Sequence, residues 1–321
     1  MIVLGVETSC DETAVAIVED GKKVLADVVF SQIDIHEKYG GVVPEIASRK
    51  HIAKIIGVFD EAFKQANLKA SDIDLVAVTT HPGLIGSLLV GINAAYAFSL
   101  ANNVECIGVD HINGHIYANY VEADFAFPTL ALVVSGGHTE LVLMRKHYDF
   151  EVLGETFDDA VGEAYDKVAR VMGLTYPGGA KVDNLANSYT GVNPYHLPIY
   201  DSDDYNFSFS GVKSAVLNLV NKCKMKGEEV DIPALANAFQ DSVTKVLVQK
   251  TIKAAKEFSV KQIIVAGGVA ANKGLRARLT EAVSHMKGLS LTFPKFRYCT
   301  DNAVMIAVAG YFQKLNGEKQ K

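Results

Sequence analysis

The sequence contains little cysteine, and its four cysteines are widely separated. Cys10, Cys106, Cys223 and Cys299 form no C-x-x-C pair. Without such pairs the sequence predicts neither a zinc ribbon nor a disulfide framework, and it favours a reducing compartment. We therefore expect four unpaired thiols and no disulfide-linked partner.

A secretory leader and an uninterrupted apolar span are also missing. The chain begins MIVLGVETS, without a basic n-region or a small-residue cleavage site. The most apolar window, residues 84–101, is interrupted by Ser87, Asn93 and two glycines, whereas a membrane span needs about 20 predominantly apolar residues. The sequence thus predicts a buried helix here, in a soluble cytoplasmic protein with no membrane partner.

The common nucleotide-binding loops and a positive net charge are absent as well. Neither G-x-G-x-x-G nor G-x-x-x-x-G-K-[ST] occurs, although a strand, Gly-Gly and a helix starting near Asn272 are expected within 261–282. The net charge is 31 − 37 = −6, which on charge alone argues against nucleic acid as a partner. Basic clusters at 48–54, 221–226 and 272–278 are typical of solvated helix faces.

Strand and helix patterns alternate along the chain, which predicts an α/β fold. Strands are expected at 2–6, 13–19, 23–31, 73–80, 129–135 and 139–146, with a long amphipathic helix at 45–67. The stretches VETSCDETAVAIV and LVVSGGHTELVLM both read strand, serine, three residues, threonine, strand. This echo indicates two similar lobes facing across a cleft.

Two histidines stand one helical turn apart in VDHINGHIYANY. His111 and His115 would share one helix face and reach one metal ion. A zinc protease of the H-E-x-x-H type needs a glutamate where this chain has Ile112, so that class is excluded. Asp301 is either a third ligand or, with Thr300, a candidate N-cap of the next helix, and spacing alone favours the cap.

Other polar residues admit two interpretations each. The two glycines of SGGH (135–138) either only form a turn or direct N–H groups at an anionic oxygen. Asp166 and Asp183 either accept hydrogen bonds from a substrate or pair with Lys167, Arg170 or Lys181 at the surface. Asp11 and Glu12 lie in the first hairpin turn, where two carboxylates would repel a phosphate unless a metal intervenes.

Taken in order, the motifs closely resemble one family. They are GVETSCDET, GGVVPEIASRKH, HINGH, VVSGGHTEL, GEAYDKVAR, YPGG, NFSFSGVK, GGVAAN and CTDNAVMIA. These are similar to the successive motifs of the TsaD family, the tRNA N(6)-adenosine threonylcarbamoyltransferases once called O-sialoglycoprotein endopeptidases. The residues within the motifs resemble those of the bacterial members. Departures are HPG (81–83), Ala180 after YPGG and the segment 193–206.

The resemblance implies an actin/hexokinase-like (ASKHA) fold with two duplicated lobes. Residues 1–128 and 300–321 would form the first lobe, completed by the C-terminal helix, and 129–299 the second. It also implies transfer of the threonylcarbamoyl group from threonylcarbamoyl-AMP to the exocyclic amine of adenosine 37 in tRNAs reading ANN codons, with release of AMP.

The resemblance further implies specific residues and partners. It assigns one divalent metal, Fe²⁺ or Zn²⁺, to His111, His115 and Asp301, and threonylcarbamoyl-AMP or an ATP-like nucleotide to the cleft. The general base would be Asp11, Glu12 or His138. Partners would be the tRNA anticodon stem-loop, a TsaB-like paralogue and a TsaE-like ATPase. The substrate-binding positions would be Val134, Ser135, Gly136, Gly137, His138, Asp166, Gly179, Asp183 and Asn272.

Three other functions are weighed against this transferase. A metallopeptidase would need a general-base carboxylate next to the first histidine, where this chain has Ile112. A sugar or acetate kinase on the same fold predicts no metal-binding histidines and no acidic pair at Asp11-Glu12. A scaffold that only holds partners together should have lost the metal ligands, and all three are present. The transferase explains most of these residues.

Overall fold

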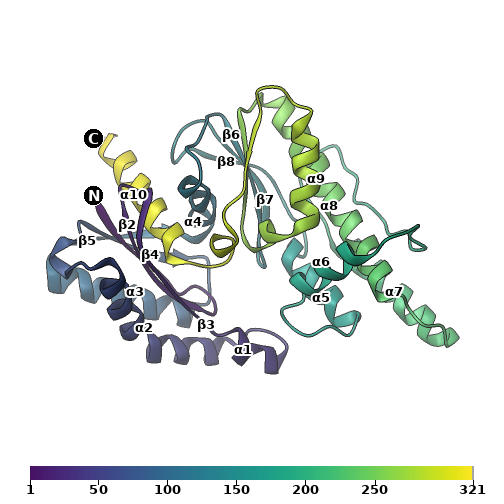
Figure 1. Cartoon of the computed structure of the whole chain (residues 1–321), viewed down its shortest axis with the longest axis horizontal. Coiled ribbons are helices and arrows are strands. Elements are labelled where there is room, and N and C mark those ends of the chain that lie inside the picture. The colour runs from purple at the N-terminus through teal and green to yellow at the C-terminus, as the bar shows by residue number, and fades with distance from the viewer. Residues whose placement is uncertain (320–321) are drawn as a thin grey trace. The chain divides into compact units, whose positions relative to one another are not determined.

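The chain folds into two units, which the computed structural model describes over residues 1–319 (Figure 1). Unit 1 comprises Met1–Phe125 and the chain from Phe293 onward, and unit 2 comprises Ala126–Thr292. The sequence prediction placed the two boundaries after residues 128 and 299. The C-terminal segment thus returns to the unit that the N-terminus begins.

Each unit is built on a five-stranded mixed sheet, and the two sheets have the same topology. In unit 1 the order is β3-β2-β1-β4-β5, and in unit 2 it is β8-β7-β6-β9-β10 when read in the matching direction. In both, the central strand pairs antiparallel with its successor on one side and parallel with a later strand on the other. The echo in the sequence therefore reflects a structural duplication. The strands are β1 (Ile2–Glu7), β2 (Glu12–Glu19), β3 (Lys23–Ser31), β4 (Leu75–His81), β5 (Glu105–Asp110), β6 (Thr129–Val134), β7 (Thr139–Met144), β8 (Phe150–Glu155), β9 (Gln262–Ala266) and β10 (Ser290–Thr292).

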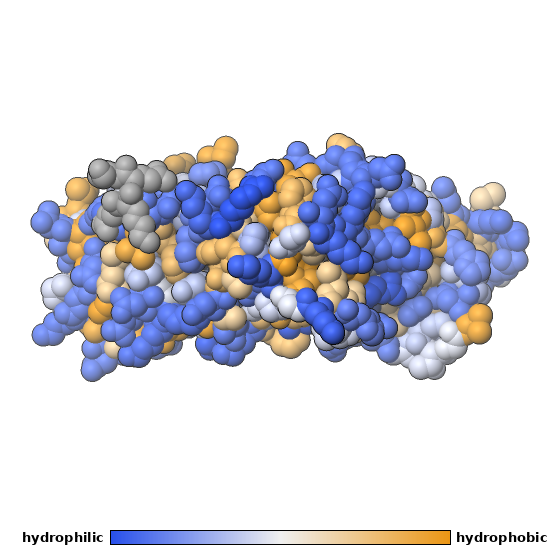
Figure 2. Space-filling model, turned by 90° about the horizontal axis from the view of Figure 1, so that it is seen from above, coloured by the Kyte–Doolittle hydropathy of each residue, from blue (hydrophilic) through white to orange (hydrophobic). Residues whose placement is uncertain are grey.

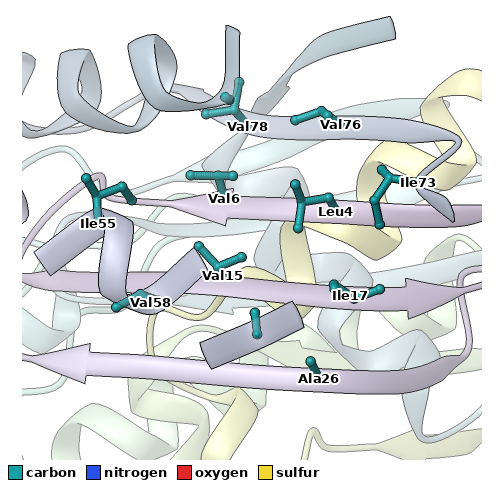
Figure 3. Close-up of a cluster of buried hydrophobic side chains, with 12 residues drawn as sticks. Leu4, Val6, Val15, Ile17, Ala26, Ile55, Val58, Ile73, Val76 and Val78 are labelled. Carbon is teal, nitrogen blue, oxygen red and sulfur yellow. The ribbon is translucent and has the colours of Figure 1, made fainter. Parts of the chain in front are cut away.

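Helices cover both faces of the first sheet. The α2 and α3 helices pack on one face and α10 on the other, with α4 against α10 (Figure 1). Figure 3 shows Leu4, Val6, Val15 and Ile17 of β1 and β2 in one buried cluster that also contains Ile55 of α2. Burying a side chain of this size contributes about 1.5–3 kcal/mol. The helices of unit 1 are α1 (Ile33–His36), α2 (Pro44–Ala66), α3 (Ile85–Asn102), α4 (His111–Tyr117) and α10 (Ala303–Lys319), with 3₁₀ turns at Glu37–Tyr39, Ala70–Asp72, Ala118–Val121 and Phe296–Tyr298.

The prediction that the apolar segment 84–101 forms a buried helix is half wrong. The helix exists as α3, and by length and composition it could cross a membrane. Its buried face, however, consists mainly of small residues, while Ile85 is 78% and Leu100 83% exposed. Small residues let α3 approach the sheet closely, since a Cβ on Gly91 would lie 2.3 Å from Thr8 Oγ1. Ile85, Leu89, Tyr96 and Leu100 consequently point outward, while Leu88 remains buried.

The helices of unit 2 accompany the second sheet. The 3₁₀ turn Gly268–Ala271 follows β9 and leads into α9. Figure 2 shows one face of the surface, on which hydrophilic residues predominate and hydrophobic ones form separate patches. The helices of unit 2 are α5 (Val161–Val171), α6 (Gly179–Ser188), α7 (Ser210–Lys226), α8 (Ile232–Glu257) and α9 (Lys273–Ser284).

Candidate functional site

Two histidines are presented by the short helix that follows β5. Asp110, at the end of β5, caps this helix by accepting a hydrogen bond from the Asn113 amide at 2.9 Å. Its first residue is His111, and His115 follows one turn later on the same face, as the spacing predicted. Both are buried, at 9% and 1% exposed, and their ring centroids lie 4.6 Å apart.

Asp301 joins these histidines from the segment before α10. The cap of α10 is neither Thr300 nor Asp301 but Asn302, whose Oδ1 accepts from the Met305 amide at 3.0 Å. The cap interpretation of Asp301 is therefore wrong, and its carboxylate is free to face the histidines. Asp301 Oδ1 lies 3.4 Å from His111 Nε2 and 3.3 Å from His115 Nε2.

The spacing of these three groups suits a metal ion. One ligand atom from each lies within 4.8 Å of the others. Ligands about 2.0–2.1 Å from a tetrahedral zinc ion lie about 3.3–3.4 Å from one another, close to the His–Asp distances here. Two imidazoles and a carboxylate suit zinc or iron and leave positions open. The three residues thus fit the metal that the resemblance implies.

Electrostatics couple the three groups strongly. Burial by itself would raise the pKa of Asp301, but the facing His111 and His115 lower that pKa far below its usual range. Burial would likewise lower the pKa of His111, and Asp301 and Glu7 reverse this, so the pKa ends well above its usual value. Burial lowers the pKa of His115. Because a metal ligand must be an unprotonated imidazole, metal binding would displace the His111 proton.

The candidate bases of unit 1 lie at the turn between β1 and β2. Asp11 is buried, and its Oδ2 has no hydrogen-bond partner among residues 1–319. Burial raises the pKa of Glu12 well above its usual value, and the charges of Asp301 and Asp11 raise it further. His51 of α2 fixes this turn, since its Nε2 lies 2.9 Å from the Cys10 carbonyl oxygen.

The SGGH turn between β6 and β7 is closed by its own hydrogen bonds. The Ser135 amide donates to the His138 carbonyl at 2.8 Å, and the His138 amide donates to Ser135 Oγ at 3.0 Å. Gly136 and Gly137 are exposed, and a Cβ on either would have no neighbour within 4 Å. The turn following Val134 therefore leaves open space beside the exposed Gly136 and Gly137.

The remaining predicted binding residues form internal hydrogen bonds in unit 2. Asp166 Oδ1 accepts from the amides of Gly178 and Gly179 at 2.8 and 3.2 Å. Asp183 Oδ2 accepts from the Lys273 amide at 3.0 Å, at the start of α9. The proposed pairing of Asp166 with Lys167 is not what forms, because the Lys167 ammonium bonds Asp159 at 2.7 Å and Glu163 at 2.8 Å.

Asn272 links the start of α9 to the core of the unit. Its Oδ1 caps α9 by accepting from the Leu275 amide at 2.7 Å, as the predicted helix start required. Its Nδ2 donates to Gln240 Oε1 at 2.8 Å, and the buried Tyr165 hydroxyl also donates to that oxygen at 3.3 Å. With these side chains engaged, the α9 entry is held rigidly.

Sequence reasoning missed two supporting carboxylates. Glu7, the last residue of β1, is fully buried against His111. Asp158 accepts hydrogen bonds from the Phe209 and Ser210 amides at 2.8 and 3.3 Å, which fixes the FSFSG loop at the start of α7. A charged residue ending an otherwise apolar strand, IVLGVE, was the available signal for Glu7.

Comparisons with known proteins concern the whole sequence and the fold. The model of the family described as "TsaD: tRNA N6-adenosine threonylcarbamoyltransferase" matches residues 23–308. The tRNA N6-adenosine threonylcarbamoyltransferase of Bacillus subtilis (strain 168) is 56% identical over 310 residues, which cover 97% of this chain and 90% of that protein. The protein of the same name from Staphylococcus saprophyticus is 55% identical, covering 97% of this chain and 91% of that one.

Solved structures with little sequence identity share the fold. HypF of T. kodakarensis aligns with a TM-score of 0.64 at 14% identity, over 98% of this chain and 48% of that one. The ROK hexokinase from Thermus thermophilus aligns at 0.50 and 14%, over 99% and 100% of the two chains. The fold is therefore the actin/hexokinase-like fold that was predicted. Given relatives more than half identical along nearly its whole length, the chain belongs to the TsaD family of tRNA N6-adenosine threonylcarbamoyltransferases.

Proposed function

We propose that this tRNA-modifying transferase moves the threonylcarbamoyl group from threonylcarbamoyl-AMP to the exocyclic amine of adenosine 37 in tRNAs reading ANN codons, and that it works in the cytoplasm. Membership of the family supports the reaction class. The observation that carries the proposal is the convergence of His111, His115 and Asp301 on one point. A kinase of the same fold has no use for such a cluster.

The chemistry requires few covalent events. The amine nitrogen attacks the carbamoyl carbon, the bond from that carbon to the phosphate oxygen breaks, and AMP leaves with the bonding pair. The amine loses one proton, for which Asp11, Glu12 and His138 are the candidate acceptors. Burial, with the charges of Asp301 and Asp11, raises the pKa of Glu12, which is the direction that a carboxylate general base needs.

Binding and charge stabilisation fall to the remaining predicted residues. Val134, Ser135, Gly136, Gly137, His138, Asp166, Gly179, Asp183 and Asn272 are the positions we propose for the adenylate or an ATP-like nucleotide. The exposed amides of Gly136 and Gly137 can face a developing negative oxygen, and one such donor is typically worth about 3–4 kcal/mol. A bound Fe²⁺ or Zn²⁺ would supply Lewis-acid stabilisation of negative charge at His111, His115 and Asp301.

The surface of unit 1 supports the expected protein partner. The face that we name the α2–α3 apolar face exposes large hydrophobic side chains on two neighbouring helices. Apolar groups clustered in this way mark interaction surfaces, and we propose that the TsaB-like paralogue docks here while a TsaE-like ATPase joins the complex. Its residues are Ile52, Ile56, Ile85, Leu89, Tyr96 and Leu100.

Several cations of the basic clusters are engaged within the chain and not directed at a tRNA anticodon stem-loop. In the 272–278 cluster the Arg276 Nε bonds the Ala270 carbonyl, and Arg278 pairs with Asp241. In the 48–54 cluster Arg49 pairs with Glu45 at 2.7 Å. A partner that contributes positive charge would therefore complete the tRNA-binding surface.

The decisive experiment is complementation with a metal-ligand variant. Cells depleted of their own transferase receive the wild-type chain, His111→Ala or, as a control, His285→Ala, which alters an exposed histidine at the end of α9. Mass spectrometry of nucleosides from total tRNA then measures threonylcarbamoyladenosine. We expect the modification with wild type and His285→Ala and none with His111→Ala.

The other outcomes separate the alternatives. Modification with all three chains would retain the reaction and refute the metal role of His111. No modification with soluble wild-type chain and compatible partners would refute the transferase and favour a kinase or a scaffold. Cleavage of a glycoprotein by the purified chain would favour the metallopeptidase, against which Ile112 stands.

A further inference from the structure

We infer that Glu7 is a positioning residue for the metal site, which it serves by orienting His111 and by supplying a second negative charge. The inference rests on the metal-binding part of the proposed function. Glu7 ends β1, the central strand of its sheet, and is 0% exposed. A buried carboxylate in the middle of a sheet is costly unless its charge is compensated, so its partners identify its role.

The hydrogen bonds of Glu7 fix it as an acceptor on both oxygens. Oε1 accepts from the Ser9 amide at 2.5 Å, and Oε2 accepts from the Thr79 hydroxyl at 2.5 Å. Thr79 lies on β4, which pairs with β1 in parallel next to this position. Ser9 lies in the turn after β1 and Thr79 lies within β4, so the carboxylate is held by donors from two separate segments.

The third partner of Glu7 is the metal-ligand candidate itself. His111 Nδ1 lies 3.1 Å from Glu7 Oε2 and 3.2 Å from Ser9 Oγ. Because the carboxylate only accepts, it draws the hydrogen of the neutral imidazole to Nδ1 and leaves the lone pair on Nε2. That nitrogen is the one directed at Asp301. Glu7 thus selects the tautomer and ring orientation that a metal ligand requires.

The two histidines differ in this respect. His115 Nδ1 is buried and has no hydrogen-bond partner within residues 1–319, so its ring is oriented by packing and by Asp301 alone. Two neutral imidazoles and the Asp301 carboxylate carry one negative charge, and Glu7 adds a second. Together they match the charge of a divalent cation in a site that water reaches poorly.

The test is zinc affinity, measured independently of catalysis. The purified full-length chain is stripped with a chelator and titrated with Zn²⁺ against a chromogenic competitor, as wild type, Glu7→Gln and Glu7→Asp. The glutamine side chain would keep the size but lose the charge and one acceptor, while the shorter aspartate would keep the charge but fall short of His111. We expect zinc binding about 10–100-fold weaker in both variants.

A carboxylate-to-amide control comes from the same sheet. Asp27→Asn alters a half-buried carboxylate on β3 that has no contact with the metal-ligand candidates, and it should bind Zn²⁺ with wild-type affinity. Co²⁺ absorption bands should shift in the Glu7 variants, while far-UV circular dichroism verifies folding. Wild-type affinity in both Glu7 variants would overturn the role of Glu7 alone, whereas a wild-type chain that binds neither Zn²⁺ nor Co²⁺ would overturn the metal site itself.

Discussion

The stability of unit 1 should fall on mild acidification because of His51. This residue is 0% exposed, with Nδ1 2.8 Å from Thr13 Oγ1 and Nε2 2.9 Å from the Cys10 carbonyl oxygen. A carbonyl can only accept, so Nε2 carries the hydrogen and Nδ1 accepts from the Thr13 hydroxyl. Burial lowers the pKa of His51, although the hydrogen bond to Cys10 opposes that shift. The folded chain therefore holds a neutral imidazole.

The magnitude follows from the difference in protons bound. An unfolded histidine has a pKa of about 6.5. Below that pH the unfolded chain binds a proton at His51, whereas the folded chain does not until its lower pKa is reached. The stability from this residue is complete above pH 6.5 and is lost as the pH falls toward the lower folded pKa. At pH 5.5 the loss can reach about 1.4 kcal/mol, the free energy of one pKa unit.

The assay compares wild type with His51→Gln. The Gln amide can donate to the Cys10 carbonyl and accept from Thr13, as the neutral imidazole does, but it does not titrate. Urea unfolding of both chains, followed by circular dichroism with a chelator present at about pH 7.5 and 5.5, gives the difference in unfolding free energy. The other histidines are common to both chains, and their effects cancel in this difference.

We expect the stability of wild type relative to His51→Gln to fall by up to about 1.4 kcal/mol between these pH values. If the difference in unfolding free energy between the two chains stays constant with pH, His51 has the same pKa in the folded and the unfolded chain. A difference that grows in favour of wild type at low pH would show that the folded chain stabilises the imidazolium. Either result would refute the assignment of donor and acceptor around Cys10 and Thr13.

Two further predictions concern a backbone position and a surface. Gly267→Ala should destabilise the chain by about 1–3 kcal/mol, because Gly267 has φ +91° and a Cβ there would lie 2.5 Å from the Val134 carbonyl oxygen. The control is Gly136→Ala, whose Cβ would meet nothing within 4 Å and which should leave the thermal unfolding midpoint unchanged. Equal midpoints for Gly267→Ala and Gly136→Ala would refute the steric argument. Leu89→Glu on the α2–α3 apolar face should abolish co-elution with the TsaB-like paralogue in size-exclusion chromatography, while Met225→Glu, an exposed residue on α7, should not; retained co-elution of Leu89→Glu would place the partner elsewhere.

Local patterns in the sequence were sufficient for most elements. Alternation predicted strands at 13–19 and 23–31, which are β2 and β3 and which pair antiparallel. The helix predicted at 45–67 is α2 at Pro44–Ala66. The helix start near Asn272 is confirmed by its cap on α9. Such features depend on neighbours within a few residues, and for that reason the sequence alone reveals them.

Burial was predicted less well, because hydrophobicity alone does not say which face of a helix is covered. The segment that becomes α3 is apolar on all sides, so its pattern gives no direction. Only the close approach of Gly91 to Thr8 shows that the small residues face the sheet. The exposed apolar residues on the opposite side were consequently read as core.

The metal centre shows what the sequence by itself determined and what only the tertiary structure decided. Helical spacing placed His111 and His115 on one face, and the family resemblance added Asp301. Spacing alone had favoured Asp301 as a cap, and it had no means of revealing Glu7. The return of the chain into α10 brings Asp301 to the histidines, and the pairing of β1 with β4 fixes Glu7 beside His111. Contacts between distant segments depend on how sheets and helices pack, and no local pattern encodes them.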